Sequence, residues 1–109
     1  MFVVPLAAIS NQRLSVRLDG ALFDLEVKTA RDVMTISIFR DAKPVIKGLR
    51  CLPDIPLIPY AYLEGLTGNF YFTTEGGAYP HYSRFGATDT LWYVTARELQ
   101  ELRHGRKAG

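Results

Sequence analysis

The chain has 109 residues, 48% of them hydrophobic, and a formal net charge of +2 at pH 7. This length predicts one domain with its own core, and so small a charge gives no electrostatic argument for nucleic-acid binding. The single cysteine, Cys51, excludes an intrachain disulfide and a cysteine-based zinc site. The start, MFVVPLAAIS, lacks the basic and long apolar regions of a signal peptide, and no apolar run approaches the ~20 residues of a membrane span. We therefore expect a soluble protein that stays in the cytoplasm where it is made.

Two alternating runs near the start predict a β-hairpin. Apolar and polar side chains alternate in RLSVRL, residues 13–18, and in FDLEVK, residues 23–28, and Asp19-Gly20 lies between them. Asp-Gly suits a type I′ turn, because both central residues of that turn need a positive φ. A two-residue loop fixes the register, which pairs residues of like character. The expected pairs are Val16 with Phe23, Leu14 with Leu25, and Arg13 with Glu26.

A second hairpin is predicted over residues 33–52. VMTISIF, residues 33–39, is rich in β-branched residues, RDAKP, residues 40–44, forms a turn, and VIKGLRCL, residues 45–52, is the return strand. A loop over residues 41–44 sets Ile38 against Lys47, which opposes an apolar and a charged side chain. A bulge near Gly48 would correct this register, since glycine within a strand often marks a bulge.

The next segment, PDIPLIPY at residues 53–60, carries proline at every third position. Proline donates no backbone hydrogen bond and biases the residue before it to extended conformations, so the segment is predicted to be an extended connector. Leu57 and Ile58 need cover, and we expect the connector to lie across the core; a polyproline II ligand is the alternative. YAYLEG, residues 60–65, is predicted to form one helical turn that ends at Gly65.

The last third predicts two strands and a helix. NFYFT, residues 69–73, alternates, while DTLWYVT, residues 89–95, is apolar on both faces. That last strand is therefore buried on both sides or presents one face to a partner. TARELQELRHGRKAG, residues 95–109, has a capping box, Thr95 with Glu98, and a narrow stripe of Leu99 and Leu102. We expect disorder beyond Gly105.

These elements predict an all-β, mainly antiparallel fold. It is a small sandwich or open barrel of about six to seven strands with a short C-terminal helix, because no helix long enough for a parallel crossover separates the strands. We divide the chain into a single β domain, residues 1–95, and a short helix with a flexible basic tail, residues 96–109.

The segment AYPHYSRFGATDT, residues 78–90, contains the residue types of a catalytic triad, namely Ser83, His81 and Asp89. No G-x-S-x-G nucleophile elbow accompanies them. The preferred interpretation is a shaped loop in which Asp89 ends the loop, Ser83 bonds its own backbone and His81 is partly exposed. We therefore expect no enzymatic activity.

Other kinds of catalytic or cofactor site find no support. Two histidines and one cysteine do not supply a metal-ligand set, and the glycine-rich GLTG and EGG lack the lysine of a phosphate-binding P-loop. Cys51 lies in a predicted strand and is expected to fill the core. We expect no catalytic residues, no metal and no cofactor.

Two kinds of binding remain open. Phe70, Phe72, Trp92 and Tyr93, with Arg84 and Arg97 nearby, fit the base-stacking platform of an OB-like module that binds single-stranded nucleic acid. The preferred interpretation is a protein-interaction module, since Tyr, Trp, Phe and Arg are enriched at interface hot spots. Residues 60–93 hold eleven aromatic side chains when His81 is counted, more than so small a core is expected to bury.

Several motifs of the chain together resemble a known family. They are PLIPYAYLEGLTGNFYFTTEGG, YPHYSRFGATDTLWYVT, the LDG hairpin, an R-D turn and GLRCLPDIPLIPY. Over residues 9–95 the chain resembles the small baseplate plug proteins of contractile-tailed phages. One departure is Ala42, where a glycine would suit the second hairpin turn.

The resemblance implies a structural virion protein of the tail baseplate, made in the host cytoplasm. Such a plug closes the tail channel until infection and contacts hub or tube subunits; a homo-oligomer is left open, and no membrane is involved. We expect Tyr82 and Phe85 to anchor the loop on the core, Gly86 to allow its turn, and Tyr79, His81 and Arg84 to face a neighbour. The candidate partner-binding residues are Tyr60, Tyr62, Tyr79, His81, Tyr82, Arg84 and Phe85.

Overall fold

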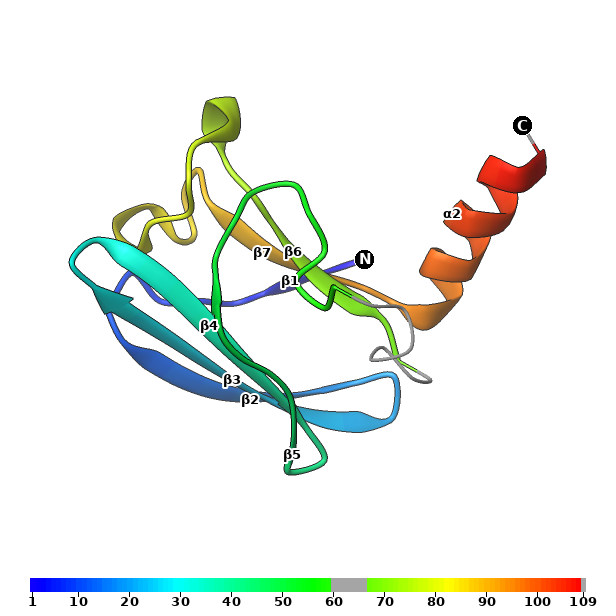
Figure 1. Cartoon of the computed structure of the whole chain (residues 1–109), viewed down its shortest axis with the longest axis horizontal. Helices are drawn as coiled ribbons and strands as arrows, with labels where there is room; N and C mark the ends of the chain where they lie inside the picture. Colours follow the sequence, from blue (N-terminus) through cyan, green and yellow to red (C-terminus); the bar gives the residue numbers. More distant parts are fainter. Residues whose placement is uncertain (60–66, 109) are drawn as a thin grey trace.

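The computed structural model describes residues 1–59 and 67–108 of the chain. Figure 1 shows two layers of strands and a helix that leaves them at one end. One sheet has three strands in the order β1-β7-β6, and the other has four in the order β2-β3-β4-β5. The strands are β1 (Phe2–Val4), β2 (Gln12–Leu18), β3 (Ala21–Ala30), β4 (Val33–Arg40), β5 (Lys43–Arg50), β6 (Asn69–Thr73) and β7 (Thr90–Val94); the helix is α2 (Ala96–Ala108).

The two sheets pack face to face and do not close into a barrel, which confirms the predicted antiparallel fold and is consistent with a sandwich. Phe23 on β3 reaches across the core: its ring centroid lies 5.2 Å from that of Phe70 on β6 and 5.7 Å from that of Tyr93 on β7. All three side chains are fully buried. Aromatic rings at this spacing and tilt attract one another beyond the burial of their area, so this trio ties the sheets together.

The first hairpin has the predicted register. Asp19 and Gly20 have φ values of 50° and 75°, as a type I′ turn requires. The pairs Val16–Phe23, Leu14–Leu25 and Arg13–Glu26 lie opposite one another on β2 and β3.

The second hairpin differs from its prediction at the turn. Its two-residue loop is Asp41-Ala42, with φ values of 50° and 68°, and β5 already begins at Lys43. The turn therefore uses the left-handed region without a glycine, which the sequence pattern did not favour. The bulge at Gly48 is confirmed: Gly48 has a φ of 61° and donates its N–H to Ser37 Oγ at 2.9 Å. This bulge corresponds to the register shift between Ile36 and Ile38, whereas the shorter turn and a second shift between Ile38 and Phe39 pair Ile38 with Ile46 and not with Lys47.

The proline-rich connector lies along the edge of β6. Leu57 and Ile58 within it are covered, as the sequence led us to expect, and each is 1% exposed. The backbone N–H of Leu57 donates to Phe70 O at 2.8 Å. The Asn69 amide holds both backbone groups of Ile58, accepting from its N–H at 2.9 Å and donating to its carbonyl at 2.8 Å. The connector thus pairs with its own chain, which does not fit an exposed polyproline II ligand.

A polar junction joins the first hairpin to the start of α2. The Tyr93 hydroxyl donates to Asp19 Oδ2 at 2.5 Å and accepts the N–H of Gly68 at 2.7 Å. The same Asp19 oxygen accepts the N–H of Ala96 at 2.9 Å. Gly68 is required here by space, since a Cβ at this position would lie 1.7 Å from Val94 O. The junction fixes where α2 leaves the sandwich.

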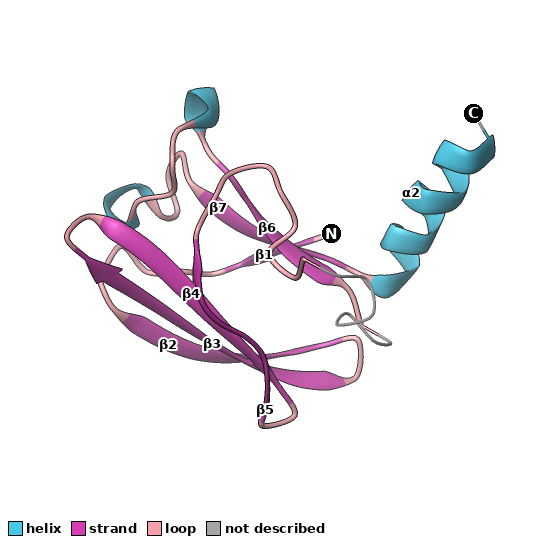
Figure 2. Cartoon of the chain, viewed as in Figure 1, coloured by secondary structure: helices cyan, strands magenta, loops and turns pink. Residues whose placement is uncertain are grey.

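The predicted capping box of α2 is confirmed. Thr95 N–H donates to Glu98 Oε1 at 3.0 Å, and Glu98 N–H donates to Thr95 Oγ1 at 3.2 Å. A second oxygen of Glu98 binds the N-terminal ammonium at 2.6 Å. The helix continues past Gly105 to Ala108, where the sequence led us to expect disorder. Figure 2 shows that α2 lies outside both sheets, joined to the end of β7.

Candidate functional site

The candidate site is the loop of residues 74–89, which joins β6 to β7 and is called here the β6–β7 loop. It contains two short 3-10 turns, η1 (Glu75–Gly77) and η2 (Tyr82–Arg84). The Thr74 hydroxyl donates to Ala78 O at 2.5 Å and closes the first turn. Gly76 and Gly77 have φ values of 65° and 73° there, a conformation that side chains with a Cβ rarely adopt.

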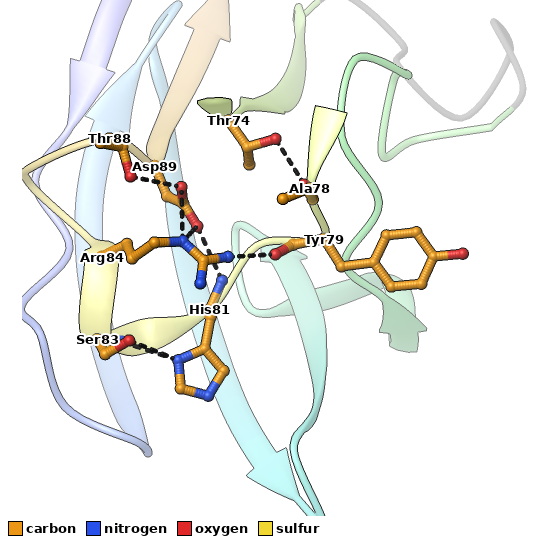
Figure 3. A network of polar contacts seen from close by, with 8 residues as sticks. All are labelled: Thr74, Ala78, Tyr79, His81, Ser83, Arg84, Thr88 and Asp89. Atoms are coloured by element: carbon orange, nitrogen blue, oxygen red, sulfur yellow. Dashed lines mark hydrogen bonds and ion pairs between the residues drawn. The ribbon is translucent and has the colours of Figure 1, made fainter. Parts of the chain in front are cut away.

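A buried carboxylate organises the rest of this loop, as Figure 3 shows. The Asp89 side chain is 0% exposed and accepts from Arg84 Nε at 3.1 Å and from the His81 backbone N–H at 3.0 Å. Thr88 Oγ1 donates to it at 3.1 Å. Arg84 Nη2 also donates to Tyr79 O at 2.7 Å. Hydrogen bonds to a charged group are stronger than neutral ones, so the carboxylate fixes the position of η2, whose two ends it bonds.

The His81 ring forms a pair with Ser83 but not with Asp89. His81 Nδ1 lies 2.7 Å from Ser83 Oγ and accepts the Ser83 backbone N–H at 3.3 Å. The imidazole therefore caps η2, and the Ser83 hydroxyl bonds this ring, where we had expected it to bond its own backbone. Nε2 faces Asp32 Oδ1 at 3.9 Å, and the Asp32 side chain is 94% exposed. The triad geometry needs an acid that is bonded to the ring, and Asp89 instead bonds the backbone of His81.

Two aromatic residues attach the β6–β7 loop to the sandwich. Phe85 is buried, and its ring stacks on Phe72 with centroids 5.9 Å apart and planes 13° apart. Tyr82 is half-buried and packs against the core cluster. Gly86 has a φ of 82° after Phe85. These positions agree with the expected anchoring by Tyr82 and Phe85 and the expected turn at Gly86.

Tyr79 is the aromatic residue that the β6–β7 loop leaves outside. It is 56% exposed, and its ring points away from the Asp89 cluster in Figure 3. The Arg50 guanidinium lies 4.6 Å from its ring centroid, a cation–π contact that limits where the ring can turn. Tyr60 and Tyr62, the other two predicted contact tyrosines, lie outside the described residues.

The nucleic-acid alternative loses most of its stacking platform. Phe70, Phe72 and Tyr93 are each 0% exposed, so their faces are not available to bases. Trp92 is half-buried, and its indole N–H donates to Thr73 Oγ1 at 2.8 Å. Arg84 is one of the two arginines that this alternative assigned to the platform, and its guanidinium is already bonded to Asp89.

Cysteine and metal chemistry likewise find no support in the part of the chain that the structure describes. Cys51 is 2% exposed, and burial raises the pKa of its thiol to about 12, so it remains a protonated core residue. Residues 1–59 and 67–108 contain no group of three metal-ligating side chains. Within those same ranges no helix is long and apolar enough to span a membrane.

The outer face of the three-stranded sheet is a second candidate surface. Strand pairing places Val3, Trp92 and Tyr71 side by side on this face. Val3 is 56% exposed, and the two aromatic residues are half-buried. The opposite outer face, on the four-stranded sheet, combines charged residues with Leu22 and Phe39, which pair with Arg17 and Asp24. Its charged residues on β2 and β3 are Arg13, Arg17, Asp24, Glu26 and Lys28. The sequence had indicated an apolar second face for residues 91–94, but not the contribution of residues 1–4.

A comparison with family models gives a match over nearly the whole chain. A model described as "Cyanophage baseplate Pam3 plug gp18" matches residues 1–97. No curated protein matches the chain. The match starts before residue 9, where the likeness in motifs began, so β1 belongs to the matched region as well.

Proposed function

Because the chain belongs to the family of cyanophage baseplate plugs, we propose that it closes the central channel of a phage tail and contacts the hub or tube subunits around that channel. A member of this family is a structural protein of the virion's tail baseplate, and a structural role indicates a protein without enzymatic activity. Before assembly it would reside in the host cytoplasm.

The saturated polar interior of the β6–β7 loop supports a contact role for its outer side. Asp89, Arg84 and the His81 backbone satisfy one another, while Tyr79 stays 56% exposed. A loop that is ordered by its own bonds loses little entropy when a partner binds. We therefore assign Tyr79 and the His81 side chain to the contact, and Tyr82, Arg84 and Phe85 to holding the loop in shape. Tyr60 and Tyr62 stay predicted contacts.

Co-purification with neighbouring tail proteins tests this proposal. The chain is co-expressed with the hub and tube proteins of the same phage, and its complex is captured through a tag on the hub. Tyr79→Ser is expected to weaken the complex about tenfold or more, as loss of an aromatic hot spot does. Lys28→Ser, on the charged outer face of the four-stranded sheet and 67% exposed, is the matched control and should bind like the parent chain.

Two negative results have different meanings. If the parent chain captures neither the hub nor the tube protein, the proposed function is wrong. If it captures one of them and Tyr79→Ser does so equally well, the function stands and the contact role of the β6–β7 loop is wrong.

A further inference from the structure

A groove separates α2 from the outer face of the three-stranded sheet. Its volume is about 340 Å³, and the residues that line it are mostly apolar: Ile55, Pro56, Tyr71, Val94, Leu99 and Leu102. Ile55 is 46% exposed and Leu102 is 59% exposed. Large apolar side chains gathered around one concave surface are typical of a docking site.

The helix beside this groove is attached to the sandwich mainly at its first turn. Its first turn is capped by Thr95 and Glu98, and it is joined to the sandwich by the bond from Ala96 N–H to Asp19 and by that from the N-terminal ammonium to Glu98. Beyond that turn α2 projects away from both sheets (Figure 1). Helices shorter than about 12–15 residues are marginal alone in water and depend on a packed apolar face. The Leu99–Leu102 side of α2 therefore needs an occupant of the groove.

The charges around the groove indicate what this occupant is. Asp54 lines the groove. Glu101 lies one turn into α2 with 68% of its side chain exposed, and it pairs with Arg97 Nε of the same helix at 3.4 Å. The segment RHGRKA, residues 103–108, makes the C-terminal half of the same helix basic. An apolar groove with two carboxylates at its rim, Asp54 and the Arg97-paired Glu101, thus lies beside a helix whose far half is basic. A second α2 that runs antiparallel over the groove would place its basic half against that rim, and its leucines against Leu99 and Leu102.

We propose that α2 of a second copy of this chain occupies the groove, so that two copies form an antiparallel, two-fold symmetric pair. An interface of this kind is self-complementary, and each copy supplies both the groove and the helix that fills the partner's groove. The pairing does not rest on the proposed plug function, and either can hold without the other.

The test measures the mass of the full chain by sedimentation equilibrium over a dilution series from micromolar to hundreds of micromolar. The parent chain is expected to reach the dimer mass in that range. Leu102→Glu should weaken dimerisation about 100-fold or more, because the two-fold axis makes one substitution remove two buried leucines. Gln100→Glu adds the same charge to the same helix, but two residues away and thus about 200° around its axis, and should leave the dimer intact.

A charge-reversed variant tests the antiparallel arrangement. Glu101→Lys is expected to weaken the dimer several-fold at low salt, and the difference from the parent should shrink at high salt. Circular dichroism checks that each variant keeps its fold.

Three outcomes overturn the proposal. They are a chain that stays monomeric at every concentration, a dimer that Leu102→Glu does not weaken, and a Glu101→Lys dimer as tight as the parent's. A monomer that binds a co-expressed tail protein through Leu102 would assign the groove to that protein and also overturn it.

Discussion

The substitution Asp89→Asn tests whether a single buried carboxylate holds the β6–β7 loop. Asparagine keeps the size of the side chain but replaces one acceptor oxygen with an N–H donor. Asp89 Oδ2 faces the backbone N–H of His81 at 3.0 Å, and both oxygens face Nε of Arg84, at 3.2 and 3.1 Å. With its oxygen at the Oδ2 position the amide still accepts from His81 and Arg84, but the negative charge is lost and the new NH2 group faces the guanidinium of Arg84. In the reverse orientation the His81 N–H loses its acceptor.

The expected loss of stability follows from the burial of each partner. Breaking a buried ion pair on one side costs about 3–5 kcal/mol, and the favourable amide orientation adds no orphaned donor to this cost. The Asp89 side chain is 0% exposed, but that of Arg84 is 41% exposed, so water can replace part of what the guanidinium loses. We therefore expect the free energy of unfolding to fall by about 2–4 kcal/mol, which corresponds to a midpoint lower by about 10 °C or more for a domain of this size.

Urea unfolding followed by circular dichroism measures this loss, and amide exchange at the His81 N–H reports on the loop itself. The matched control is Glu26→Gln, the same chemical change in a surface pair with Lys28 whose side chains are 26% and 67% exposed, where we expect a much smaller effect. If Asp89→Asn unfolds at the same urea concentration as this control and His81 exchange stays slow, the carboxylate does not hold the loop and the reasoning fails.

Four further predictions follow from the backbone and the titrating groups. Ala42→Gly should raise the free energy of unfolding by about 0.5–1 kcal/mol, because Ala42 has a φ of 68° where a Cβ is strained; an unchanged urea midpoint would contradict this. Tyr93→Phe should lower the free energy of unfolding by about 1–3 kcal/mol in thermal unfolding, since the buried Gly68 N–H loses its acceptor. An unchanged free energy of unfolding would mean that water takes the acceptor's place. Burial raises the pKa of Cys51 to about 12, so iodoacetamide at pH 8 should label only unfolded protein, as mass spectrometry can check. The hydrogen bond from the N-terminal ammonium lowers the pKa of Glu98 from 4.5 to about 2; its stabilising effect is thus present above pH 4.5 and lost as the pH falls towards 2, and Glu98→Gln should remove this part of the acid dependence.

The first hairpin could be read from the sequence because local and global signals agree there. Asp19-Gly20 fits the turn by its backbone preference, and alternation fits the same register by burial. The prediction of the second turn was wrong because Asp41 and Ala42 both adopt a positive φ although neither is a glycine. The paired strands impose that conformation through their ladder, including Asp41 N–H to Leu22 O at 2.8 Å, and a strand that lies two elements away in the chain cannot be seen in a local window.

The site was predictable in its residue types but not in its bonds. The anchoring roles of Tyr82 and Phe85 follow from their apolar surface, which any fold must cover. The role of Asp89 depends on which donors converge on it, and these come from residues five and eight positions earlier in the loop. The sequence spacing of Asp89 from His81 and Ser83 could not by itself distinguish a carboxylate that holds a loop from the acid of a catalytic triad. The contribution of β1 was missed for a similar reason, because a strand of three residues carries too little alternation to recognise.

The strand β7 places the two proposed contact surfaces at opposite ends of one rigid element. It begins where the β6–β7 loop ends and stops where α2 is capped, and its five residues span about 17 Å at the usual rise of a strand. Its inner side is fixed by Leu91 and Tyr93 in the core, and the Tyr93 hydroxyl is bonded to Asp19, so neither end can shift without disturbing the sandwich. One partner at the loop and a second copy at α2 can therefore bind at the same time without competing for space, and the sandwich would hold them at a set distance.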